Sequence, residues 1–117
     1  ILSITFHTVP NQLEHWNQYV NTELIDLVEN LMEVEKYILS DIETEMLTEG
    51  KNTNLFLIFD NNEKRDDFLE IELKNIQERI ESKFGKNVMI FVTKIHPIKT
   101  LFMQICITSR RWRSLNT

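Results

Sequence analysis

The first third of the chain combines an alternating segment with a helical pattern. Apolar and polar side chains alternate over residues 1–7, which is typical of a half-buried strand. Its inward residues are expected to be Leu2, Ile4 and Phe6. Pro10 then marks a helix start, because proline is favoured in the first helical turn. Apolar residues recur every three or four positions up to about Met32, which predicts an amphipathic helix. They are Leu13, Trp16, Val20, Leu24, Leu27, Val28 and Leu31.

Residues 34–47 fit two patterns. Apolar residues recur every fourth position from Val34 to Met46, which could continue the helix, but the same residues also lie on one face of a strand. The turn cluster of residues 48–52 contains Gly50 and precedes a clear strand, which needs a pairing partner just upstream. We therefore predict a long strand here, which could carry a bulge.

The second half repeats this order with clearer signals. Leu55–Phe59 is continuously apolar and predicts a central strand that is buried on both faces. The run Asp60-Asn61-Asn62-Glu63 supplies N-cap candidates for a second helix, and Glu63 lies three residues after Asp60, the spacing of a capping box. A second helical stripe follows, made of Leu69, Leu73, Ile76, Ile80 and Phe84. We expect Gly85 to end this helix with a positive φ. Residues 88–95 are rich in β-branched and aromatic residues and predict the last strand.

The order strand, helix, strand, strand, helix, strand predicts an α+β fold. It is the βαββαβ order of a ferredoxin-like sandwich, in which two helices cover one face of an antiparallel four-stranded sheet. We assign residues 1–99 to this domain and residues 100–117 to a C-terminal extension. Within the extension, Leu101–Ser109 alternates like a strand and is expected to be ordered, as an extra strand or as a cover on another protomer. Residues 110–117 form a short basic tail.

Several runs together resemble one family. They are the first strand, Trp16 in the first helix, NTELIDLVENLMEVEKYILSDI, LFLIFD, the helix end KFG and the strand VMIFVTKI. The chain resembles a small bacterial family described as domain of unknown function 4286, over roughly residues 1–95. The resemblance implies a ferredoxin-like fold of about this size. It implies no activity and no catalytic residues, and the segment after Lys99 departs from its pattern.

Composition narrows the class of protein. The chain has 117 residues, a formal charge of −5, 42% hydrophobic and 26% charged residues, which fits one small globular domain. No apolar run approaches the ~20 residues of a membrane helix, and no signal peptide is visible, so we expect a soluble protein with no membrane partner. The single Cys106 excludes an internal disulfide and favours a reducing compartment, the cytoplasm. Two glycines are too few for a phosphate-binding glycine-rich loop.

Charge is unevenly spread along the chain. Residues 23–49 contain nine acids and one base, a net charge of −8, whereas residues 94–117 contain five bases and no acid. The two segments could attract each other within a protomer or between two. They could equally be two solvated faces, since exposed ion pairs contribute only ~0–1 kcal/mol each.

The histidines and acidic pairs offer little chemistry. His7 and His96 end antiparallel neighbouring strands, so about 20 Å separates them and they cannot share a metal ion. His15 has no ligand four residues on, so we expect no metal site and no cofactor. Asp66 and Asp67, placed in the first turn of the second helix, complement the helix dipole. Two further acids, Glu43 and Glu45, would share a strand face, which could raise a pKa, but nothing places a nucleophile beside them.

Two other candidates concern the extension and nucleic acid. Cys106 lies between isoleucines and is interpreted as a small buried residue, although Arg110 and Arg111 could lower its pKa if they folded close. Phe56 or Phe59 could stack a base, with charge and stacking supplied by residues 110–113. The strand TNLFLIFD lacks the basic–Gly–aromatic signature, however, and the net charge opposes phosphate binding. Nucleic acid is therefore an unlikely partner.

The clearest functional prediction concerns the face of the sheet without helices. If Leu55, Leu57 and Phe59 face the helices, Phe56 and Ile58 face outward, and we expect them beside Phe91. Such a patch is larger than a monomer usually exposes, so the candidate interface Phe56, Ile58 and Phe91 predicts a homodimer. The alternative interpretation is a monomer in which Leu101–Ser109 covers the sheet of its own chain.

Two functions remain open for this chain. The first is a homo-oligomeric module that binds a small ligand or a protein and has no catalytic residues. The alternative is an enzyme of the dimeric α/β-barrel type, acting on a small apolar molecule between two sheets. The two differ in whether the space between the sheets is filled, or forms a pocket with polar groups such as His7 or Thr5.

Overall fold

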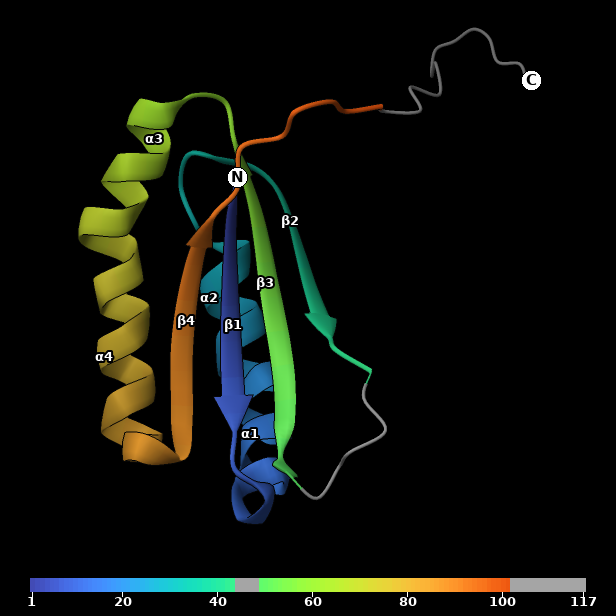
Figure 1. Ribbon diagram of the computed structural model, residues 1–117. Helices are drawn as coiled ribbons and strands as arrows, with labels where there is room; N and C mark the ends of the chain where they lie inside the picture. Colours follow the sequence, from blue (N-terminus) through green and yellow to red (C-terminus); the bar gives the residue numbers. More distant parts are fainter. Residues whose placement is uncertain (44–48, 102–117) are drawn as a thin grey trace, which may run out of the picture.

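The computed structural model describes residues 1–43 and 49–101 of the chain. Its strands form one antiparallel sheet in the order β2-β3-β1-β4 (Figure 1). The strands are β1 (Leu2–Thr8), β2 (Val34–Asp41), β3 (Lys51–Phe59) and β4 (Val88–Lys94). β1 pairs with both β3 and β4, so β1 and β3 are central and β2 and β4 are the edges. This confirms the predicted α+β ferredoxin-like fold.

Two helical segments cover one face of this sheet. The first consists of a 3₁₀ turn (Pro10–Gln12), α1 (Leu13–Tyr19), a π turn (Val20–Leu24) and α2 (Ile25–Glu29). The second consists of α3 (Asn62–Asp67), a π turn (Phe68–Glu72), α4 (Leu73–Phe84) and a 3₁₀ turn (Gly85–Asn87). Figure 1 shows α1 and α2 behind the strands and α3 and α4 along the side of β4. The first segment ends at Glu29, shortly before the predicted end near Met32.

The core lies between the sheet and the helices. Leu2, Ile4 and Phe6 of β1 are fully buried, as their alternation predicted. Four aromatic rings meet where α1 approaches the end of α4, with centroids 5.4–5.7 Å apart; they belong to Phe6, Trp16, Tyr19 and Phe84. Aromatic pairs at this spacing add to the stabilisation from burial. The apolar stripes of both helices therefore meet one another as well as the sheet.

β2 resolves the ambiguous segment of the sequence. It is a strand from Val34 to Asp41, and its register against β3 shifts between Val34 and Lys36, as a β-bulge does. A bulge inserts an extra residue into one strand, here at Glu35. The predicted strand and its bulge are thus confirmed up to Asp41, and residues 44–48 lie outside the described residues.

The ends of the second helical segment confirm the prediction for Gly85 and identify which of the N-cap candidates begins the helix. Gly85 follows α4 with φ of 58°, as predicted. The N-cap is Asn61, one residue later than the spacing of Asp60 and Glu63 indicates, because Asn61 is extended and its Oδ1 accepts from the backbone N–H of Lys64 at 2.9 Å. Asp60 instead forms an ion pair with the Lys64 ammonium at 3.1 Å.

β3 corrects the expectation of a strand buried on both faces. Leu55 and Leu57 are buried under the helices, but Phe56 and Ile58 are only half-buried, since no described helix covers their side of the sheet. The predicted strand Leu101–Ser109 begins at the exposed Leu101 and otherwise lies outside the described residues. Within the described part of the chain, no helix is long and apolar enough to cross a membrane.

Candidate functional site

The candidate site is the face of the sheet that carries no helices. The strand register assigns every second residue of each strand to this helix-free face. Its members are Lys36, Ile38 and Ser40 on β2, Asn52, Asn54, Phe56 and Ile58 on β3, Ser3, Thr5 and His7 on β1, and Met89, Phe91 and Thr93 on β4. Ile42 extends the set, because its N–H donates to the carbonyl of Asn52 at 2.9 Å.

A polar track runs along the two central strands of this face. The Asn54 amide donates to Ser3 Oγ at 2.8 Å and, at 3.3 Å, to Thr5 Oγ1 and the Ile4 carbonyl. Further along, His7 Nδ1 lies 2.7 Å from Asn52 Oδ1. The antiparallel register sets Asn54 opposite Thr5 and Asn52 opposite His7, which brings these side chains together. The centre of the helix-free face can therefore donate and accept hydrogen bonds.

Apolar side chains flank the polar track on both edge strands. Ile38 and Ile42 lie on the β2 side, and Met89 and Phe91 lie on the β4 side; each is between 40% and 57% exposed. A monomer rarely leaves several large apolar side chains exposed on one face. The patch is therefore wider than Phe56 and Ile58 alone, the β3 residues that the sequence indicated.

The three predicted interface residues share this face, but they are not adjacent. Phe56 and Ile58 lie on β3, whereas Phe91 lies on β4. The expectation that they lie beside Phe91 is wrong, because β1 runs between β3 and β4. Phe56 is opposite Ser3 of β1, and Phe91 is opposite Thr5. The aromatic side chains thus stand on the two sides of the polar track.

The helix-free face is almost uncharged. Among the paired strand positions described on this face, Lys36 is the one Asp, Glu, Lys or Arg residue; the bulge residue Glu35 has no pairing partner that assigns it to a face. Members of the acidic block pair elsewhere: Asp41 lies 3.1 Å from the Lys51 ammonium, and Glu23 lies 3.8 Å from that of Lys83. The arginines of the basic tail lie outside the described residues, so its predicted attraction to the acidic block stays a prediction.

The predicted histidine and acidic candidates are scattered. His7 lies on the polar track, His96 is exposed beyond the other end of β4, and His15 contacts Gln12 on the first helical segment. No group of three or more His, Cys, Asp or Glu side chains in the described residues could hold a metal ion. Glu43 is exposed beyond β2, while Glu45 and Cys106 lie outside the described residues.

Asp66 and Asp67 require a correction. The helical segment begins at Asn62, so its first turn contains Glu63, and the two aspartates lie at the end of α3. Asp66 instead accepts from the Arg65 guanidinium at 3.0 Å. This contact compensates the charge of Arg65, whose side chain is largely buried at the end of the sheet near β3.

Among the described residues, the ionisable side chains with shifted pKa values lie away from the helix-free face. Burial raises the pKa of Tyr19, which packs in the aromatic core. Partial burial also raises the pKa of Glu72, although a hydrogen bond from the Met32 backbone acts in the opposite direction and lowers it. The Lys64 ammonium, by hydrogen bond and charge, lowers the pKa of Asp60. These shifts follow from packing and ion pairing around the helices.

One family model matches residues 1–98, a span that includes every described strand and helix. The chain belongs to the family described as Domain of unknown function (DUF4286). This confirms the family that the sequence resembles. A search of the curated proteins found no match, and a search of the solved structures found none either. The function of this DUF4286 domain must therefore be argued from its own geometry.

Sequence reasoning missed two features of the DUF4286 domain. Tyr19 is buried beside Trp16, and its position three residues later on the same helix could have revealed it. Asn54 is the hub of the polar track, but its partners are about fifty residues away on β1, so no local pattern indicates its role. The alternation of β3 shows only which face Asn54 takes.

Proposed function

We propose that this domain is a homo-oligomeric binding module that pairs with a second copy through its helix-free face and has no catalytic centre of its own. The observation that supports this is the exposure of Ile38, Ile42, Met89 and Phe91 on a face with one charged strand residue. Because the chain has a single cysteine, Cys106, and so no internal disulfide, a reducing compartment is favoured, and we place the protein in the cytoplasm.

The chemistry of the face favours a second copy over other partners. A two-fold interface sets one patch against itself, so like charges would face each other. Asparagine, serine and threonine avoid this, because each can donate to and accept from its own kind. Nucleic acid needs several cations, and Lys36 is the one cationic Lys or Arg among the described strand residues of the face.

Burial of the apolar side chains would supply the driving force for association. Burying ~400 Å² of apolar surface on each of two copies contributes roughly 20 kcal/mol at ~25 cal/mol per Å². This gross term opposes the loss of translational and rotational freedom, about 4–15 kcal/mol, and the further costs of ordering side chains and desolvating polar groups. Burying the polar track makes the free energy of association less favourable unless its groups form hydrogen bonds across the interface.

Sedimentation equilibrium tests this proposal. We expect a dimer at micromolar concentration, and a monomer for the double variant Phe56→Glu, Ile58→Lys, which places opposite charges on the face. Ile71→Glu is the matched control, because Ile71 is 69% exposed on the outer side of the second helical segment. It should leave the dimer unchanged. A monomeric wild type refutes the dimer, and an unchanged dimer in a well-folded double variant refutes the choice of face.

The polar track supports a second candidate function. If two helix-free faces approached without filling the space between them, His7, Thr5 and Asn54 would line an enclosed space with apolar walls. Such a space suits a small apolar molecule, as in an enzyme of the dimeric α/β-barrel type. Native mass spectrometry of freshly purified protein distinguishes the candidates, because a retained small molecule would add its mass to the dimer.

A further inference from the structure

β4 is an edge strand that exposes apolar side chains on both of its faces. Met89 and Phe91 are about half exposed on the helix-free face. On the helix side, Val88 is buried, Ile90 is partly buried and Val92 is 37% exposed. In the sheet that the structure describes, β4 pairs with β1 alone, so its outer backbone edge is free. An apolar free edge promotes aggregation unless something covers it.

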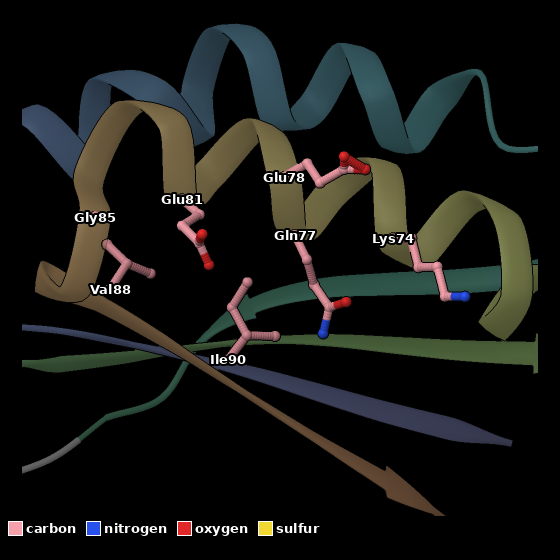
Figure 2. Close-up of a pocket in the computed structure, with 7 residues that line it drawn as sticks. All are labelled: Lys74, Gln77, Glu78, Glu81, Gly85, Val88 and Ile90. Atoms are coloured by element: carbon pink, nitrogen blue, oxygen red, sulfur yellow. The ribbon is translucent and has the colours of Figure 1, made fainter.

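A groove lies between this edge and α4. It has a volume of about 520 Å³ and is lined by Lys74, Gln77, Glu78, Glu81, Gly85, Val88 and Ile90. Figure 2 shows Gln77 and Glu81 pointing from α4 toward β4, while Ile90 points up from the strand. A groove between an edge strand and a helix suits an extended segment, which adds backbone hydrogen bonds to the edge and places alternate side chains in the groove.

We propose that Leu101–Ser109 of the same chain pairs antiparallel with β4 as a fifth strand and fills this groove. β4 ends at Lys94, and residues 95–100 are long enough to reverse the chain. Pairing Lys94 with Leu101 sets Val92 opposite Met103, Ile90 opposite Ile105 and Val88 opposite Ile107. Every second residue from Leu101 to Ile107 is aliphatic or Met, and this register turns them toward the helix side of the sheet, with Ile105 and Ile107 beside the groove residues Ile90 and Val88.

The charges near the Gly85 end of the groove support the antiparallel orientation of Leu101–Ser109. In this register, Arg110 and Arg111 follow the segment past Val88 and reach the end of α4 near Gly85. Glu81 lines the groove toward this end, close to the negative pole of the α4 dipole, and Glu78 lines its middle beside Gln77 (Figure 2). Lys74 lies at the far end of the groove, and Lys83, near Gly85, is paired with Glu23. An apolar segment followed by arginines therefore complements the apolar floor of the groove and its two carboxylates, although Lys86 adds one positive charge at the Gly85 end.

The connection after β4 permits this placement. Ile95 still donates to the carbonyl of Ile1 at 2.8 Å, but residues 96–101 are exposed and run past the start of β1 (Figure 1). Ile98 and Leu101 are almost fully exposed, so redirecting the connection toward the edge of β4 sacrifices no described core contact. The new strand would extend the sheet without covering the central polar track.

Disulfide trapping in the full chain tests the fifth strand. In the proposed register Met89 lies opposite Cys106, the one cysteine of the chain. We expect the variant Met89→Cys to form an intramolecular disulfide under oxidised glutathione at least tenfold faster than Ile38→Cys. Ile38 is the matched control, because it is 57% exposed, compared with 48% for Met89, on the same face but on the opposite edge strand. Mass spectrometry and non-reducing gels identify the products.

A second experiment tests which alternate side chains of Leu101–Ser109 face the groove. In the Met89→Cys background, Ile105→Asp should slow trapping strongly, because it places a charge in the groove, whereas Gln104→Asp should leave trapping nearly unchanged. Equal trapping of Met89→Cys and Ile38→Cys overturns the proposal. So do products that are only intermolecular, which would mean that a second copy occupies the edge. Equal effects of the two aspartate substitutions would overturn the assigned register.

Discussion

The indole nitrogen of Trp16 donates a hydrogen bond of 2.9 Å to the hydroxyl of Thr53, and both side chains are buried. This bond joins α1 to the central strand β3 across thirty-seven residues of sequence. Because water does not reach the pair, each group depends on the other for its hydrogen bond. The largest side chain of the core is thereby held at one orientation against the sheet.

We predict that Thr53→Val destabilises the protein by about 1–3 kcal/mol, because valine keeps the shape of threonine but leaves the buried indole N–H without an acceptor. Urea unfolding measures the change. Thr53→Ser is the control, since it keeps the hydroxyl and loses only a methyl group. A valine variant as stable as the wild type, or a serine variant less stable than the valine variant, would contradict this role.

The two glycines should differ in their tolerance of alanine. Gly50 has φ of 106°, and an added Cβ would overlap the carbonyl oxygen of Thr8, so we expect Gly50→Ala to cost roughly 2 kcal/mol or more. Gly85 has φ of 58° and ψ of −130°, a conformation that is essentially restricted to glycine, but open space around it, so Gly85→Ala should cost only the backbone strain, about 1–3 kcal/mol. Chemical denaturation gives both values, and the reverse order would refute this explanation.

Glu72 should make stability depend on pH. Its pKa is raised, first by partial burial and further by the charge of Glu33, so the folded state disfavours the carboxylate. The carboxylate therefore costs stability above the ordinary pKa of 4.5, and this cost disappears as the pH falls through the raised value. We expect Glu72→Gln to have a higher melting temperature than the wild type at pH 7 and the same one below about pH 4.

Thermal melts at several pH values check the Glu72 prediction. Glu70→Gln removes the same charge from an exposed neighbouring position and serves as the control. An advantage of Glu72→Gln that is independent of pH would indicate a packing effect. A loss of stability at pH 7 would show that the hydrogen bond from the Met32 backbone outweighs burial.

The sequence by itself determined the elements and the faces that they bury. The alternation of Leu2, Ile4 and Phe6 predicted the inner face of β1, and Gly85 ended α4 with the expected positive φ. These features are local, because strand and helix geometry repeats every two or 3.6 residues whatever the rest of the chain does. The N-cap Asn61 is one of the candidates that the run of residues 60–63 offered.

Tertiary structure decided which side chains of different strands meet. Alternation placed Phe56 and Phe91 on the helix-free face, but only the order β2-β3-β1-β4 put β1 between them. The same order made Asn54 the hub of a polar track with Ser3 and Thr5, and left β4 at an edge beside a groove. Strand pairing joins residues about fifty positions apart, and its register depends on the packing of the whole core, so no local spacing in the sequence encodes it.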